Sequence, residues 1–179
     1  ILKTDIPALM GEEPFKVVAN LPYYITTPIL LTLLERRLPI TRIVTMVQRE
    51  VAERMIALPG GRDYGALSVA VQYYTEPRLA IEVSPRCFLP PPAVESAVMD
   101  CVVRKTPPVA VEDEKHFFRV VRAAFGQRRK TIGNALKSLG LPRDILQGAL
   151  SKAGIDPLRR GETLSLSEFA ALAGALTEK

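Results

Sequence analysis

The residues of this chain that are best suited to chemistry lie together in one tetrapeptide, Asn20-Leu21-Pro22-Tyr23. The Asn20 side chain carries an amide carbonyl, and the backbone carbonyl of Leu21 is a second hydrogen-bond acceptor beside it. Two acceptors can hold both hydrogens of one amino group, while the ring of Tyr23 can stack on the ring that bears this group. The combination suits a flipped-out nucleobase. Taken alone, however, Asn-x-Pro is more often a turn, with the tyrosine as a half-buried packing residue.

An apolar run leads into this tetrapeptide and predicts a strand. Val17, Val18 and Ala19 show no alternation with polar residues, as in a parallel strand that is covered on both faces. Pro22 cannot donate a backbone hydrogen bond, so strand pairing should end there. The candidate residues are therefore expected at the carboxyl end of a buried strand, where ligands bind in open α/β sheets.

Apolar patterns predict that the rest of the first part is a mixed α/β structure. Further strands are expected at 43–47, 79–83 and 97–103, and helices at 27–35, 48–58 and 65–74. The order strand, helix, strand up to residue 47 implies a parallel crossover, and the last two strands suggest an antiparallel pair at the edge of the sheet. In the helix at 48–58, Val51, Met55 and Leu58 should face inward. The apolar residues of segment 65–74 also alternate as in a strand, so the pattern alone does not decide between a helix and a strand.

A proline-rich segment at 85–94 separates the last two predicted strands. Because prolines cannot form a regular ladder, this segment should be an ordered loop. Phe88 is its most conspicuous side chain. The ring could serve as a hydrophobic plug that pins the loop, or it could contact a ligand.

The second part of the chain is predicted to be helical. Thr106-Pro107-Pro108 is the best candidate for a domain boundary, which divides the chain into domains 1–108 and 109–179. Helices are expected at 113–125, 131–139, 142–153 and 165–176. Short helices with short connections favour a compact helical bundle.

The net charge of +5 is concentrated in this second part. Residues 1–108 carry 12 Lys and Arg against 11 Asp and Glu, whereas residues 109–179 carry 12 against 8. The second domain is therefore the better candidate for contact with a polyanion, although charge alone is equally consistent with a solvated basic surface. The candidate phosphate contacts lie on the helix at 113–125 and just beyond it: Arg119, Arg122, Arg128, Arg129 and Lys130.

Composition excludes several classes of protein. The 179 residues, 47% of them hydrophobic, can form one domain with a core and a smaller appendage. Since no apolar run approaches the roughly 18 residues of a membrane span and no signal peptide is recognisable, we expect a cytoplasmic protein that does not contact membranes. Cys87 and Cys101 lack the spacing of metal ligands and are expected to be reduced thiols, and His116 is the single histidine, so no metal site is predicted.

Five segments, taken in order along the whole chain, resemble the ribosomal RNA adenine dimethyltransferases, an S-adenosylmethionine-dependent family that modifies small-subunit rRNA. They are Asn20-Leu21-Pro22-Tyr23, Gln48-Arg49-Glu50-Val51-Ala52-Glu53-Arg54, Tyr64-Gly65-Ala66-Leu67-Ser68, Phe88-Leu89-Pro90-Pro91-Pro92-Ala93-Val94-Glu95-Ser96-Ala97-Val98 and Phe125-Gly126-Gln127-Arg128-Arg129-Lys130-Thr131. The erythromycin-resistance methyltransferases share the first segment, but residues 126–136 are more similar to the branch that acts in ribosome maturation.

The resemblance implies a fold and a reaction. It implies an α/β fold, in which a partial Rossmann-like methyltransferase sheet precedes a small all-helical RNA-binding domain, and it favours a helix at 65–74. The implied reaction is dimethylation of adenine N6, with small-subunit rRNA or a pre-ribosomal subunit as partner. Asn20, Leu21, Pro22 and Tyr23 would be the catalytic residues, Tyr23 and Phe88 would sandwich the base, and Asn20 would also border the S-adenosylmethionine.

The chain departs from the family pattern in one respect. The glycine-rich cofactor loop and the acidic residues expected on the ribose and near the adenine would precede Ile1, and the sequence does not contain them. We therefore interpret the chain as the carboxyl-terminal part of a longer enzyme and expect it to be inactive alone. Two alternatives stay open: an RNA-binding or ribosome-assembly module without catalysis, and a DNA adenine methyltransferase, which would use the same acceptors but would not carry the signature at 125–136.

Overall fold

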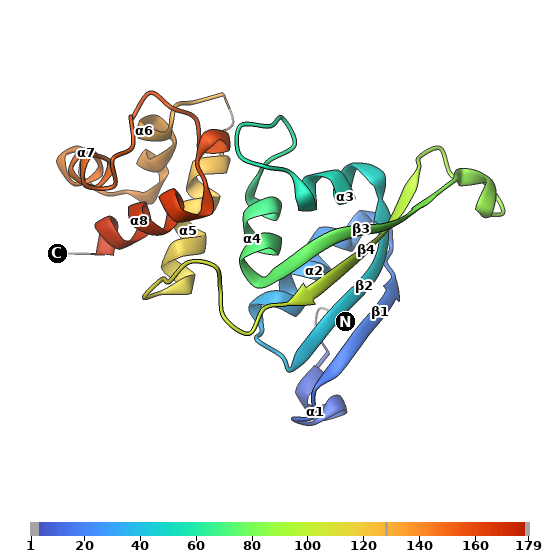
Figure 1. Ribbon diagram of the computed structural model, residues 1–179. Coiled ribbons are helices and arrows are strands. Elements are labelled where there is room, and N and C mark those ends of the chain that lie inside the picture. The colour runs from blue at the N-terminus through green and yellow to red at the C-terminus, as the bar shows by residue number, and fades with distance from the viewer. Residues whose placement is uncertain (1–3, 128, 178–179) are drawn as a thin grey trace. The chain divides into compact units, whose positions relative to one another are not determined.

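The computed structural model describes residues 4–127 and 129–177 (Figure 1). The chain divides into two compact units, Ile1–Ile56 with Ala70–Thr106 and Ala57–Val69 with Pro107–Lys179. The stretch Ala57–Val69 thus groups with the second unit, although it lies inside the predicted domain 1–108. The predicted domain division stays a prediction.

The first unit contains a sheet of four strands in the described residues, β1 (Phe15–Asn20), β2 (Ile40–Gln48), β3 (Thr75–Val83) and β4 (Ser96–Val103). The strand order is β1-β2-β4-β3, with β1 and β2 parallel and the other pairs antiparallel. The predicted parallel crossover and antiparallel pair are confirmed. Only β3 of that pair lies at the edge, because β4 is inserted between β2 and β3.

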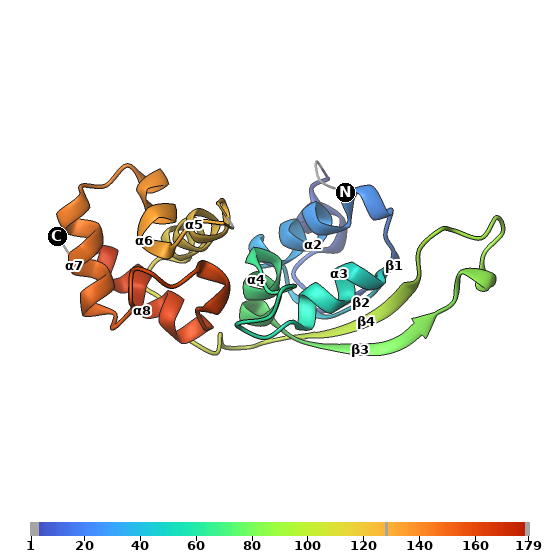
Figure 2. The same cartoon turned by 90° about the horizontal axis from the view of Figure 1, so that it is seen from above.

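Helices cover one face of this sheet. They include α2 (Thr26–Glu35), α3 (Arg49–Ile56) and the end of α4 (Ala66–Tyr74), as Figure 2 shows from above. The short helices α1 (Ile6–Met10), η1 (Tyr23–Ile25) and η2 (Pro85–Cys87) lie in connections. Ile43 and Val47 of β2, Met99 of β4 and Met55 of α3 are almost fully buried and form the core of this layer. The helix at 65–74 is confirmed, since its apolar residues are buried on more than one side.

Two sequence predictions for residues 1–108 are wrong. The strand β1 is not covered on both faces: its burial alternates along the strand, and Val18 is 79% exposed. Leu58 does not face inward. Its side chain is 73% exposed because α3 already ends at Ile56.

The second unit is all-helical in its described residues, as predicted. Its elements are α5 (Glu114–Phe125), α6 (Ile132–Ala135), η3 (Leu136–Leu139), α7 (Arg143–Lys152), η4 (Gly161–Thr163) and α8 (Leu166–Thr177). Phe117, Leu136, Leu150, Leu164 and Phe169 are fully buried and form its core.

Local signals explain where these helices end. Gly140 and Gly154 have φ values of 73° and 67°, which favour glycine, and each follows a helix directly or within two residues. The start of α8 is a capping box, in which the Ser165 hydroxyl accepts from the Glu168 N–H and the Glu168 carboxylate accepts from the Ser165 N–H. Among the described residues, no helix is long and apolar enough to cross a membrane.

Candidate functional site

The predicted acceptors lie where the two parallel strands end. Asn20 is the last residue of β1 and is exposed, like Lys16 and Val18 at alternate positions of the same strand. The Leu21 side chain is buried, and its N–H donates to the carbonyl of Met46 on β2 at 3.3 Å. Within the described residues, neither the Asn20 side chain nor the Leu21 carbonyl accepts a hydrogen bond from another protein group. The structure therefore anchors Leu21 at the end of the strand and leaves the exposed Asn20 beside it.

Pro22 fixes the turn that follows. Its φ and ψ angles of −61° and 128° place it as the N-cap of η1, and its carbonyl accepts hydrogen bonds from the Ile25 N–H and the Thr26 hydroxyl, both at 3.1 Å. Thr26 is 1% exposed, so the second bond is made inside the protein. The loop between the strand and α2 is consequently held by one backbone hydrogen bond and one from the Thr26 side chain.

Tyr23 is half-buried and is tied to another strand. Its hydroxyl forms a hydrogen bond with the hydroxyl of Ser96, the first residue of β4. Ser96 is 1% exposed and lies in register with Gln48 on β2 and Val83 on β3. The tyrosine ring is thus connected to the start of an inner strand, at the same end of the sheet as Asn20.

Phe88 lies on the loop between β3 and β4, which projects beyond the sheet (Figure 1). The residue is half-buried and ends η2, and its N–H donates to the Pro85 carbonyl at 3.2 Å. In the described part of the chain its ring makes no ring contact with Tyr23. The structure thus brings Asn20, Leu21, Pro22 and Tyr23 together, while Phe88 is held on a separate loop.

A charged network around Arg49 at the base of this loop was missed by the sequence interpretation. The Arg49 guanidinium lies 2.5 Å from the Glu95 carboxylate, 3.0 Å from that of Glu53 and 3.8 Å from that of Glu82. These carboxylates, Glu95 most strongly, raise the pKa of Arg49 above its ordinary value. Only the pair Arg49 and Glu53, four residues apart on one helix, could have been found from the sequence.

The other titratable groups do not add reactive chemistry to this end of the sheet. Burial raises the pKa of the Cys101 thiol to about 12, so this thiol is neutral, and both Cys101 and the exposed Cys87 are free. The described residues contain no cluster of three His, Cys, Asp or Glu side chains that could hold a metal ion. The side chains of this chain that are available at the candidate site are therefore the neutral acceptor Asn20 and the aromatic ring of Tyr23.

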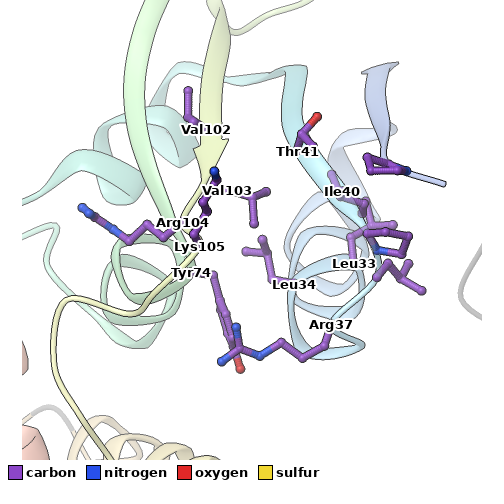
Figure 3. A pocket seen from close by; sticks show the side chains of 13 residues that line it. Leu33, Leu34, Arg37, Ile40, Thr41, Tyr74, Val102, Val103, Arg104 and Lys105 are labelled. Carbon is purple, nitrogen blue, oxygen red and sulfur yellow. The ribbon is translucent and has the colours of Figure 1, made fainter. Parts of the chain in front are cut away.

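A cavity of about 470 Å³ lies at the opposite end of the sheet, where β2 begins and β4 ends (Figure 3). Its walls include Leu33, Leu34 and Val103, and Arg37 reaches across it to Tyr74, with the guanidinium 4.9 Å from the ring centroid. The cavity is the largest of the described pockets by this volume, but Asn20 and Tyr23 do not line it. We therefore assign the candidate site from the geometry around Asn20 and not from the size of a pocket.

The predicted basic cluster belongs to the second unit. Arg119 and Arg122 are exposed on α5, whereas Phe118 and Val121 of the same helix are buried in the bundle. Arg129 and Lys130 are exposed between α5 and α6, and Arg128 lies outside the described residues. The helix α5 is therefore amphipathic. Whether these cations bind phosphates stays a prediction.

Comparison with known protein families and sequences gives a consistent result. The family described as "Ribosomal RNA adenine dimethylase" matches residues 1–178. A curated protein named ribosomal RNA small subunit methyltransferase A, from Moorella thermoacetica, is 60% identical over 167 residues, which are 93% of this chain and 58% of that protein. The protein of the same name from Geobacillus thermodenitrificans is 52% identical, covering 98% of this chain and 63% of the relative. The chain thus spans about three fifths of the length of these relatives.

Solved structures agree on the fold. A dimethyladenosine transferase from Plasmodium falciparum superimposes with a TM-score of 0.76 over 92% of this chain and 68% of that one, at 23% identity. The 23S rRNA methyltransferase ErmE gives a TM-score of 0.64 at 26% identity, over 96% of this chain and 70% of that one. The predicted fold, part of a Rossmann-like methyltransferase followed by a helical unit, is confirmed.

Proposed function

Because this chain belongs to the ribosomal RNA adenine dimethylase family, we propose that it forms the base-binding part of an enzyme that methylates adenine N6 in small-subunit rRNA. One observation carries the proposal. At the end of a parallel strand, the Asn20 amide and the Leu21 carbonyl have no protein donor among the described residues, and the Tyr23 ring beside them is fixed by Ser96. This is the arrangement that an extruded adenine requires.

The proposed role of the acceptors follows from the chemistry of the amino group. The lone pair of the adenine amino nitrogen is delocalised into the ring, which makes this nitrogen a poor nucleophile. If the Asn20 side chain and the Leu21 carbonyl accept its two hydrogens, they hold the nitrogen in an orientation in which the lone pair can point at the methyl donor. Pro22 keeps the second acceptor in place, and Tyr23 with Phe88 would stack on the two faces of the base.

S-adenosylmethionine, when bound, would supply the electrophilic methyl group. The residues of this chain fit one border of such a site, since Asn20 is exposed at the carboxyl end of β1. They do not supply the glycine-rich loop with which α/β folds of this type hold a cofactor. We propose that this chain orients the base and binds the cofactor only weakly by itself.

The second unit would contribute RNA affinity. The exposed cations of α5 and of the turn after it can contact phosphates without reading the sequence of the RNA. The proposed partner is small-subunit rRNA, free or in a pre-ribosomal subunit, and such a substrate would be met in the cytoplasm. The candidate contacts are Arg119, Arg122, Arg128, Arg129 and Lys130.

A hybrid enzyme can test this function. In the hybrid, this chain replaces the matching segment of the Moorella thermoacetica protein. We expect transfer of labelled methyl groups from S-adenosylmethionine to adenine N6 of small-subunit rRNA, and much less transfer to DNA of the same sequence. A folded hybrid that binds rRNA without any methyl transfer would support the non-catalytic alternative, and preferential methylation of DNA would support the DNA methyltransferase.

A further inference from the structure

We infer that Ser96 and Arg49 position the two aromatic rings of the base site, Ser96 by holding Tyr23 and Arg49 by holding the loop that carries Phe88. The inference rests on the proposed function and extends it to two residues that do not touch the base. Its starting point is one dipeptide, Glu95-Ser96, at which the proline-rich loop ends and β4 begins. This dipeptide is held from two sides by residues that precede it by more than 40 positions.

Ser96 holds Tyr23 through the hydrogen bond between their hydroxyl groups. Because the Ser96 side chain is 1% exposed, it cannot exchange this partner for bulk water without a cost. The tyrosine hydroxyl lies at the far end of its ring, so the bond fixes the direction of the ring axis. The backbone of Ser96 is itself fixed, because it lies between β2 and β3, in register with their last residues Gln48 and Val83.

Arg49 holds the end of the loop in two ways. Its backbone N–H donates to the backbone carbonyl of Glu95 at 3.0 Å, and its guanidinium pairs with the Glu95 carboxylate at 2.5 Å. The same guanidinium lies near Glu53 on α3 and Glu82 on β3, so one side chain connects three segments. Among the described residues, the Arg49–Glu95 pair is the one ion pair between side chains that joins residues 84–95 to the rest of the first unit.

Because these side chains are exposed, the ion pairs of Arg49 should matter more for the position of the loop than for the stability of the fold. Arg49 is 47% exposed, and Glu95 and Glu82 are 56% and 64% exposed. Ion pairs between such exposed groups contribute little to the stability of a fold. The tip of the loop is open to solvent, and Leu89 there is 98% exposed. Loss of the Arg49 side chain should therefore leave the fold intact and loosen the loop that carries Phe88, whose end would keep only the backbone bond to residue 49.

The consequence for a bound base is geometric. A base sandwiched between two rings needs them at roughly twice the van der Waals contact distance of about 3.5 Å, and both must keep it in line with Asn20 and Leu21. A misplacement of about 1 Å at a reacting centre can cost on the order of 100-fold in rate. Ser96 and Glu95 are neighbours in the sequence. The Tyr23–Ser96 bond and the Arg49–Glu95 contacts would therefore set the positions of both rings from one point of the backbone.

The hybrid enzyme provides the test. We expect Ser96→Ala and Tyr23→Phe each to lower kcat roughly 10- to 100-fold, and Arg49→Gln to lower it by up to about fivefold, as for the loss of an exposed ion pair. The KM for rRNA should change less than about threefold. The double variant Tyr23→Phe with Ser96→Ala should be no slower than the slower single variant, because both changes remove the same bond. Arg49→Lys should recover part of the rate, since lysine can still pair with Glu95. Arg86→Gln is the matched control, because it removes one positive charge from the loop that carries Phe88 without touching the pair with Glu95. It should keep kcat.

The outcomes distinguish this inference from the function on which it rests. An unmodified hybrid without methyl transfer would contradict the proposed function itself. An active hybrid in which Ser96→Ala and Arg49→Gln keep full kcat would overturn the positioning roles and leave the function standing. The positioning role of Arg49 would also be refuted if Arg49→Gln and Arg86→Gln lowered the rate equally, because charge alone would then explain the effect, or if the decrease in kcat followed a decrease of folded protein in circular dichroism.

Discussion

Gly161 is the position where a single methyl group should cost the second unit the most. A Cβ atom built there would lie 2.8 Å from the backbone oxygen of Ala124 and 3.1 Å from the Ala124 Cβ. Ala124 is 2% exposed on α5, and a backbone oxygen inside a helix cannot move aside as a flexible side chain can. Overpacking of this kind typically destabilises a protein by about 1–3 kcal/mol. We therefore expect Gly161→Ala to lower the free energy of unfolding by that amount.

Gly148 provides a matched control in the same unit. It is an exposed residue inside α7, and a Cβ atom there would meet nothing within 4 Å. Gly148→Ala should stabilise the chain by up to about 1 kcal/mol, because alanine loses less backbone entropy in a helix. Thermal unfolding followed by circular dichroism should separate the variants, with midpoints that move by about 2–4 °C per kcal/mol. Equal midpoints for the two variants would show that η4 can move away from α5, which would refute this close packing.

Three further predictions concern charge and ligand binding. The hydrogen bond from Arg159 is the largest cause that lowers the pKa of Glu168 from 4.5 to about 2, so this carboxylate should contribute its full stabilisation above about pH 4.5 and lose it as the pH falls towards 2. Glu168→Gln should flatten the unfolding free energy in this window, and an unchanged pH profile would contradict the assignment. The 179-residue chain alone should bind S-adenosylmethionine weakly or not at all in calorimetry, and micromolar affinity would contradict this. Neutralising Arg128, Arg129 and Lys130 together should weaken rRNA binding and reduce the logarithmic salt slope by roughly 0.7–0.9 for each phosphate that is no longer neutralised. An unchanged slope in a folded triple variant would assign these cations to the solvated surface.

The sequence could predict the elements that local patterns encode. The strand ending at Asn20 and the helix from Asp113 to Phe125 follow from apolar spacing, from Pro22 and from the Asp113 N-cap, whose carboxylate accepts from the Lys115 and His116 N–H groups. The exposure of Val18 could not be predicted, since an apolar run does not reveal which face of its strand is covered.

The interactions that hold the candidate site could not be predicted from the sequence, because their partners are far apart along the chain. The hydrogen bond between Tyr23 and Ser96 joins residues 73 positions apart, and the pair between Arg49 and Glu95 joins residues 46 positions apart. Neither pair has a spacing that a helix or a hairpin would favour. Both arise because β4 enters the sheet beside β2, which brings the end of the proline-rich loop next to η1 and the start of α3.

The most direct test of the proposed base site is methyl transfer by the hybrid enzyme that carries Asn20→Ala. Removal of a hydrogen-bonding partner of the reacting group should lower kcat by roughly 10²- to 10³-fold, while the affinity for rRNA stays nearly unchanged because the phosphate contacts lie elsewhere. Asn134→Ala, an exposed asparagine of the second unit, is the matched control and should keep full activity. An Asn20→Ala hybrid that turns over at the unmodified rate would contradict the role of the strand end as the site that holds the adenine amino group.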